Sequence, residues 1–239
     1  MTRIRVLTYA THAEGKFNDM MSDARKHNIP IEVVGWGDKW TSYFGKLKSV
    51  QKKIKTFRET DLVIVVDGFD TRIKNNIEAV HNLWKTKFNN APIVFSKETQ
   101  TIPIGILSRY ITRRCFGGFL NAGLYMGRAK NLVDLYEDAM QYESKCRKDD
   151  QCAFNKLVQK HSIVIDTDCL IFNNISYYDR AKDLQNLPGV FCSYPGTFSW
   201  KRQMRVPFEY GPIFLPEIIG FVILIYLITQ LTTKRLKKM

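Results

Sequence analysis

Hydrophobic residues occur along the chain in two patterns, which predict alternating strands and helices. Leu62 to Val66 is an unbroken apolar run, too short for a helix and typical of a strand buried on both faces. Phe17, Met20 and Ala24 instead recur at the spacing of one helical face. By these criteria we expect strands at 5–9, 31–34, 62–66, 92–96, within 117–126 and at 163–166, and helices near 17–24, 46–57, 77–84, 132–142 and from 149 onward. Such alternation with short connections predicts an α/β fold.

Two carboxylates directly follow the central apolar run. Asp67 and Asp70, with Gly68 and Phe69 between them, fall at the carboxyl end of the predicted strand, where open α/β sheets bind ligands. Hard divalent cations are bound by carboxylate oxygens together with the oxygens of a substrate diphosphate, so an Asp-x-x-Asp pair suits a metal–diphosphate site. The alternative is an ordinary Asp/Gly turn with two solvated acids.

The formal net charge of +13 narrows the classes of partner. The basic residues are spread over the chain, with clusters at 46–55 and 201–205. Nucleotide phosphates or an anionic membrane surface explain this excess, so no nucleic acid partner is predicted. Most of these charges are expected on solvated faces. Lys46 lies nearest the loop before its predicted helix and is therefore the lysine placed to reach a phosphate.

The carboxyl-terminal segment predicts a membrane anchor. Residues 213–231 are apolar apart from Glu217, Thr229 and Gln230, and basic residues follow them. This length just suffices to cross a hydrocarbon core of roughly 30 Å. We therefore expect a catalytic domain at 1–205, a linker at 206–212, a single-pass C-terminal anchor at 213–233 and a basic tail at 234–239. The alternative is a buried or interfacial helix, since Pro216 and Glu217 interrupt the apolar run.

Cysteine usage and the amino terminus predict the side of the membrane. Five cysteines without a C-x-x-C pair argue against a disulfide framework or a zinc site and fit a reducing compartment. The chain starts in a strand, without the apolar segment of a secretory signal. We therefore expect the catalytic domain to face the cytoplasm, although the basic tail would then lie on the far side, against the positive-inside tendency. Asn174 belongs to an N-glycosylation sequon that would report a luminal location if accessible.

Several short segments, taken in order, resemble one enzyme family. They are TYATHAEGKF, VVGWGDKW, VVDGFDT, VFSKE, FLNAGLYMG, DDQ and VIDTDCLIFNNI. Their co-occurrence from about Ile4 to Ile175 resembles the GT-A glycosyltransferase domain of the procollagen lysyl hydroxylase and procollagen glucosyltransferase family, a domain that giant DNA viruses also encode. The resemblance implies a mixed central sheet flanked by helices. It also implies transfer of a hexose from a UDP-sugar, with Mn²⁺, to a hydroxyl of a protein or glycan.

The resemblance also assigns residues to the site. It implies Asp67 and Asp70 as metal and diphosphate ligands, and Asn121 and Gly123 beside the donor sugar. Asp149, Asp150 and Gln151 match an acidic run near the donor sugar and acceptor, and Glu98 matches another acid of the site. The resemblance implies a catalytic role for Asp149, Asp150 and Glu98, together with Asn121. The residues implied to line the nucleotide pocket are Thr8, Ala10, Trp36, Trp40 and Phe69. The alternative for Asp149 and Asp150 follows from their place at the start of a predicted helix, where acids are favourable because of the helix dipole.

One departure from the family pattern concerns the metal shell. The family has a His-Gly-Asn-Gly segment whose histidine completes the metal ligands, whereas no histidine follows His161 here. In its place Ser193, Tyr194 or water could bind the metal, or Lys201 and Arg202 could neutralise the diphosphate. A membrane-tethered, degenerate relative that binds nucleotide without turnover is therefore one alternative function. A dehalogenase-type phosphotransferase is another, but its Asp-x-Asp-Gly-Thr spacing differs from that of Asp67 and Asp70.

Overall fold

A six-stranded mixed sheet forms the centre of the first of two compact units, Met1–Gly196 and Thr197–Met239. The computed structural model describes residues 3–99, 119–147, 149–175, 181–194, 215 and 219–230. The strand order is β2-β1-β3-β6-β5-β7. These strands are β1 (Ile4–Tyr9), β2 (Ile31–Val34), β3 (Leu62–Asp67), β5 (Ile93–Lys97), β6 (Leu120–Arg128) and β7 (Ile163–Asp166). Only β6 runs antiparallel to its neighbours among these strands, which confirms the expected mixed sheet.

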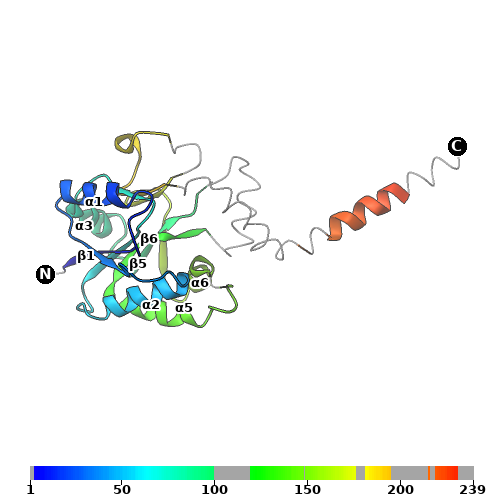
Figure 1. Ribbon diagram of the computed structural model, residues 1–239, viewed down its shortest axis with the longest axis horizontal. Coiled ribbons are helices and arrows are strands. Elements are labelled where there is room, and N and C mark those ends of the chain that lie inside the picture. The colour runs from blue at the N-terminus through cyan, green and yellow to red at the C-terminus, as the bar shows by residue number, and fades with distance from the viewer. Residues whose placement is uncertain are drawn as a thin grey trace. The chain divides into compact units, whose positions relative to one another are not determined.

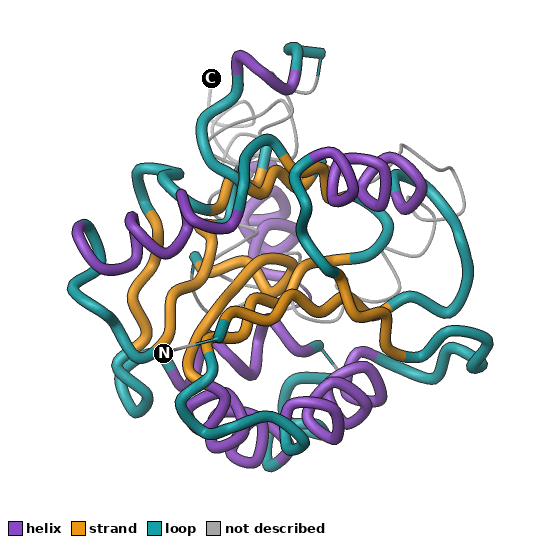
Figure 2. The backbone as a smooth tube through the Cα atoms, turned by 90° about the vertical axis from the view of Figure 1, so that its left-hand side faces the viewer, coloured by secondary structure: helices purple, strands orange, loops and turns teal. Residues whose placement is uncertain are grey.

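Helices cover both faces of this sheet (Figures 1 and 2). They are α1 (Phe17–Lys26), α2 (Tyr43–Ile54), α3 (Ile77–Thr86), α5 (Ala129–Met140) and α6 (Asp150–Leu157). Val63 and Val65 of β3 pack into the core that α2, α5 and α6 cover. Leu62, Ile64 and Val66 alternate to the other face and join the core beneath α1 and α3. Because β3 is buried on both faces, its unbroken apolar run follows from its central position.

A second, three-stranded sheet was not predicted from the sequence. It consists of β4 (Thr71–Ile73), β9 (Phe191–Ser193) and β8 (Phe172–Asn174), in that order. No strand was expected beyond 163–166, yet β9 pairs antiparallel with β4 directly after Asp70. Each of these strands has three residues, which is too short to show a two-residue alternation. The second sheet brings Tyr194 to the turn that follows β3, because its backbone N–H donates to the Asp70 carbonyl oxygen at 2.8 Å.

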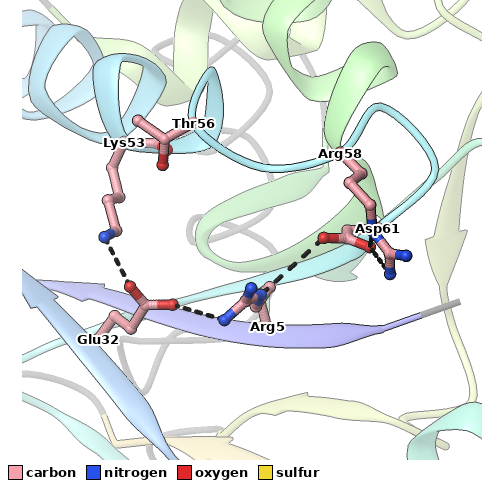
Figure 3. Close-up of polar contacts among 6 residues, drawn as sticks. All are labelled: Arg5, Glu32, Lys53, Thr56, Arg58 and Asp61. Carbon is pink, nitrogen blue, oxygen red and sulfur yellow. Dashed lines mark hydrogen bonds and ion pairs between the residues drawn. The ribbon is translucent and has the colours of Figure 1, made fainter.

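An ion-pair network joins β1, β2, α2 and the start of β3 (Figure 3). The Arg5 guanidinium lies between Glu32, at 3.5 Å, and Asp61, at 4.0 Å. Lys53 of α2 also binds Glu32, with 2.7 Å between Nζ and Oε2. Burial alone would raise the pKa of Asp61, but the hydrogen bonds and charge of Arg58 outweigh burial and lower that pKa. This network fixes the amino-terminal ends of β1, β2 and β3 relative to one another.

The expectation of cysteines without a disulfide is wrong. Cys146 and Cys152 form a disulfide, with Cα atoms 5.6 Å apart, while Cys169 and Cys192 are free thiols. The fold brings the two sulfurs together because the chain turns back between α5 and α6, a turn that no C-x-x-C spacing announces. The cysteines therefore no longer favour a reducing compartment. Cys115 lies outside the described residues.

In the second unit the structure describes Leu215 and a helical stretch at 219–230. Its side chains are exposed, including Phe221, Ile223 and Leu227. Among the described residues, none of the helices combines the length and the apolar character needed to cross a membrane. The anchor expected at 213–233 and the basic tail at 234–239 lie partly or wholly outside the described residues, so they stay predictions.

Candidate functional site

The turn after β3 places Asp67 and Asp70 at the carboxyl end of the central strand, as the sequence predicted. Gly68 lets this turn pass close to β1, since a Cβ at this position would lie 2.7 Å from the Tyr9 carbonyl oxygen. The Phe69 carbonyl oxygen accepts a hydrogen bond from the Lys16 N–H at 2.7 Å. Gly15 is needed there because its φ is +55° and a Cβ would meet that same oxygen. The turn is thus fixed by backbone contacts on both sides.

A small pocket opens beside Asp67. Its walls come from three strands and one helix, and it is lined by Tyr9, Lys46, Val65, Val66, Asp67, Ala122 and Gly123. Gly123 packs against Asp67, since a Cβ at Gly123 would lie 3.6 Å from Asp67 Oδ2. Gly123 and Lys46, both predicted from the sequence, therefore lie in one pocket with one of the two metal-binding candidates.

A buried ion pair forms the next part of the site. Lys46 Nζ of α2 lies 3.0 Å from Asp150 Oδ2 of α6, and their side chains are 12% and 7% exposed. Burial would lower the pKa of Lys46, but the charges of Asp150 and Asp67 outweigh it and raise that pKa. Lys46 therefore stays positively charged, and it interacts with both Asp67 and Asp150. A cation in this position suits contact with an anionic diphosphate.

Asp149 caps the amino terminus of α6. Its Oδ1 accepts a hydrogen bond from the Cys152 N–H at 2.8 Å, so the helix-terminal position considered for this acid is confirmed. Burial raises the pKa of Asp149 to about 6, and the charge of Asp150 adds to the rise. A carboxyl group with this pKa changes its protonation state near neutral pH, which is a property shared by many groups at catalytic sites.

Glu98, just past the end of β5, binds side chains from three other elements. Its Oε2 accepts hydrogen bonds from Asn121 Nδ2 of β6 and Gln151 Nε2 of α6, at 3.1 and 2.8 Å. Its Oε1 accepts hydrogen bonds from Asn174 Nδ2 of β8 and the Thr99 N–H, at 2.8 and 3.0 Å. The structure therefore groups Glu98 with Asn121 and Gln151, as expected, and adds Asn174.

Asn174 had been noted only as a sequon residue. Asn174 is 4% exposed and its side chain donates a hydrogen bond to Glu98, so the fold hides the asparagine of the sequon.

The residues predicted to line the nucleotide pocket fall into two groups. Trp36 and Trp40 are exposed, and Trp40 makes an edge contact with Tyr9 at 5.9 Å between ring centroids. Phe69 stands beside His12 at 5.5 Å. Thr8 and Ala10 are fully buried, and the Thr8 hydroxyl donates to the Val66 carbonyl oxygen. Neither side chain lines the pocket, contrary to the prediction, because both are buried against Gly68 and expose no atoms to a ligand.

Two further predicted residues, Lys201 and Arg202, lie outside the described residues. Neither Tyr9 nor Tyr43 was predicted as a site residue from the sequence. Tyr9 lines the pocket, and Tyr43 packs on Trp40. The position of Tyr9 at the last residue of a predicted strand could have singled it out.

The carboxylates of Asp67 and Asp70 suit a metal ion that takes its remaining ligands from the substrate. Among the residues that the structure describes, no group of three or more His, Cys, Asp or Glu side chains could hold an ion. Mg²⁺-type ions, however, commonly use one or two carboxylates and take their remaining ligands from substrate phosphates and water. Asp67 and Asp70 fit that arrangement. Ser193 is buried in β9 and the Tyr194 ring lies beneath Lys16 Nζ at 5.6 Å, so a third ligand from either stays a prediction.

Comparison with known proteins decides the family. The family model of the PLOD GT domain matches residues 1–187. The chain belongs to this family. It is a glycosyltransferase-type domain, as the segments from about Ile4 to Ile175 had indicated, and the phosphotransferase alternative is wrong.

Two individual proteins extend this result. Procollagen-lysine,2-oxoglutarate 5-dioxygenase of Drosophila melanogaster is 23% identical over 190 residues, which are 72% of this chain and 26% of that protein. The chain therefore matches about a quarter of the length of this relative. The crystal structure of a glycosyltransferase involved in the glycosylation of the major capsid of PBCV-1 superposes with a TM-score of 0.52 and 11% identity. The match covers 86% of this chain and 99% of that one, and at this identity it shows the fold alone.

Proposed function

We propose that this PLOD GT domain transfers a hexose from a UDP-sugar to a hydroxyl of a protein or glycan, with a divalent ion such as Mn²⁺. The observation that carries the proposal is the convergence of Asp67, Lys46 and Gly123 in one pocket at the carboxyl end of the central strand. Ligands of α/β sheets bind at the carboxyl ends of the strands, and the charged side chains of Lys46 and Asp67 suit a nucleotide diphosphate with its metal ion there. Family membership supports the reaction class.

Each side of the pocket has a separate task in this proposal. Asp67 and Asp70 would hold the divalent ion, which supplies positive charge to the departing diphosphate. Lys46 would bind the same diphosphate from the α2 side, and its pairing with Asp150 fixes its position. Asp149 and Asp150 bring carboxylate charge toward the donor sugar, where an oxocarbenium-like centre develops. The exposed rings of Trp36 and Trp40 and the half-buried ring of Phe69 are suited to stack on a nucleobase.

Titration with UDP in the presence and absence of Mn²⁺, followed by an assay of UDP-sugar turnover, tests this function. We expect Mn²⁺-dependent UDP binding and at least about a hundredfold loss of turnover in Asp67→Asn and Asp70→Asn, the order found when one charge-stabilising group is removed. Asp134→Asn, on the exposed face of α5, is the matched control and should retain full activity. Full Mn²⁺-dependent turnover in both site variants would show that the metal assignment is wrong.

The degenerate, binding-only alternative predicts a different result in the same experiment. The lack of a third metal-binding side chain among the described residues favours it. UDP binding without turnover of any of the common UDP-hexoses would support this alternative. The donor sugar is identified by whichever UDP-hexose is consumed.

We also propose that residues 213–233 bind a lipid bilayer and hold the enzyme on a membrane. Exposed Phe221, Ile223 and Leu227 support this, because apolar side chains all around a helix are otherwise found only in protein interiors. The cytoplasmic side stays a prediction, and the Cys146–Cys152 disulfide weighs against a reducing compartment.

A further inference from the structure

β6 forms one wall of the pocket through Ala122 and Gly123, and its pairing with β5 is irregular at these residues. β5 pairs with β6 in register from Ile93 to Phe95, where Phe95 faces Tyr125, but the next pair joins Ser96 to Asn121. The register shift leaves residues 122–124 of β6 without partners on β5. Buried backbone N–H groups need hydrogen-bond acceptors. The N–H groups of Ala122 and Gly123 must therefore be bonded to acceptors outside β5.

Two side-chain amides supply those acceptors. Asn121 Oδ1 accepts the hydrogen bond of the Gly123 N–H at 2.9 Å. Gln151 Oε1, from the first turn of α6, accepts that of the Ala122 N–H at 3.2 Å. A primary amide has distinct donor and acceptor ends, so each side chain serves this purpose only when its NH₂ group points away from the wall.

Glu98 fixes the orientation of both amides. The NH₂ groups of Asn121 and Gln151 both donate to Glu98 Oε2, at 3.1 and 2.8 Å. A carboxylate accepts at both oxygens, whereas an amide at position 98 has one NH₂ group, which would face donor to donor either Asn121 and Gln151 or Asn174 and the Thr99 N–H. With Asn174 and the Thr99 N–H on Oε1, the carboxylate accepts hydrogen bonds from four donors.

We propose that Glu98 is a positioning residue for the donor pocket: through Asn121 and Gln151 it holds the backbone of Ala122 and Gly123 against Asp67. It thereby sets the width of the pocket next to the diphosphate, and it does not exchange protons with the acceptor. This changes the catalytic role that the family resemblance implied for Glu98. The inference rests on the proposed function only in that the pocket binds UDP.

The test compares the wild type with Glu98→Gln in two independent measurements. The first is hydrogen exchange of the backbone amides of Ala122 and Gly123, with the Ile64 amide of β3 as a reference for global opening. The second is the UDP dissociation constant with Mn²⁺, measured by calorimetry without turnover. We expect exchange at Ala122 and Gly123 to quicken at least about tenfold relative to Ile64, and UDP binding to weaken by about tenfold, the equivalent of one lost hydrogen bond.

Two further variants keep the result decisive. Glu98→Gln combined with Gln151→Glu returns a donor–acceptor match between residues 98 and 151, and should recover slow exchange at Ala122 and part of the UDP affinity. This readout also applies if Glu98→Gln alone fails to fold. Glu137→Gln, an exposed residue of α5, is the same chemical change far from the pocket and should alter neither measurement.

Unchanged exchange and unchanged UDP affinity in Glu98→Gln, with loss of turnover, would overturn the positioning role and restore a direct catalytic one. A lack of recovery in the double variant would also overturn it. If the wild type itself binds no UDP, the proposed function fails, whereas the exchange measurement still decides whether Glu98 orders the wall.

Discussion

At the scale of single residues, the site derives its properties from burial as much as from charge. Asp150 and Lys46 come from different helices and are buried as a pair, so each fixes the position of the other. Asp149, the residue before Asp150, caps α6, and its carboxyl group is mostly ionised only above its raised pKa. Two adjacent carboxylates therefore have different partners, a lysine for Asp150 and a backbone N–H for Asp149.

The raised pKa of Asp149 predicts a pH dependence of stability. Its pKa is about 6 in the folded state against 3.8 for an unperturbed Asp, so between these values the folded state retains a proton that the unfolded state has lost. The free energy of unfolding therefore falls as the pH rises through this window. Asp149→Asn keeps an acceptor for the Cys152 N–H but cannot titrate.

Urea denaturation of both proteins between about pH 4 and pH 7 measures this effect. The wild type should lose about 1–3 kcal/mol relative to Asp149→Asn over this range, since one pKa unit corresponds to roughly 1.4 kcal/mol. Asp134→Asn, an exposed change of the same kind, should run parallel to the wild type. A difference between wild type and Asp149→Asn that stays constant with pH would contradict the raised pKa.

At the scale of elements, the turn between α5 and α6 carries much of the site. The Cys146–Cys152 disulfide closes this turn around Asp149, Asp150 and Gln151. The Asp149 N–H donates to the Cys146 carbonyl oxygen at 2.9 Å, and its carboxylate accepts from Cys152. Both cysteines of the disulfide therefore form a hydrogen bond with Asp149. The disulfide and the helix cap thus stabilise the same turn.

Reduction of this disulfide should destabilise the domain. A cross-link between residues six apart closes a short loop, for which the expected loss is about 2 kcal/mol, because the unfolded chain regains conformational freedom. Thermal unfolding with and without a dithiol reductant measures it. The variant Cys146→Ser/Cys152→Ser should unfold at the lower temperature in both conditions. An unchanged melting temperature in wild type whose thiols titrate as fully reduced would contradict this expectation.

At the scale of the whole molecule, two units of different character share one chain. Met1–Gly196 has a two-faced core around its sheet, whereas the described helix at 219–230 exposes its apolar side chains. A surface of this kind in water is unfavourable by about 25 cal/mol for each Å² of apolar area. This cost favours transfer of the helix to a lipid environment.

Flotation with liposomes of anionic and zwitterionic lipids tests the membrane proposal on the full chain. The wild type should float with the liposomes, and Ile223→Asp/Leu227→Asp should remain largely in the dense fraction, because each acid in an apolar membrane region costs on the order of 2–3 kcal/mol. Val164→Asp, a similar change at an exposed position of β7, should float like the wild type. Equal flotation of all three proteins would argue against the role of this helix.

The sequence by itself determined the elements that a local pattern encodes. The bounds of β2 and β7 agree with the expected 31–34 and 163–166, and those of β1, β3 and β5 lie within one residue of expectation. A buried strand needs an apolar run, and a covering helix needs an apolar face, so both leave a signal within a few neighbouring residues. Asp67 and Asp70 could be placed at the carboxyl end of the central strand for the same reason.

Only the tertiary structure decided which distant residues meet. The antiparallel insertion of β6, the short strands of the second sheet and the disulfide depend on contacts between segments far apart in the chain. The same holds for Lys46 with Asp150, and for Glu98 with Asn121, Gln151 and Asn174. Local patterns specify the type of an element but not its partner, because pairing is settled by the packing of the whole core. The orientation of the two amides at Glu98 follows from that packing and from the gap in the pairing of β5 with β6.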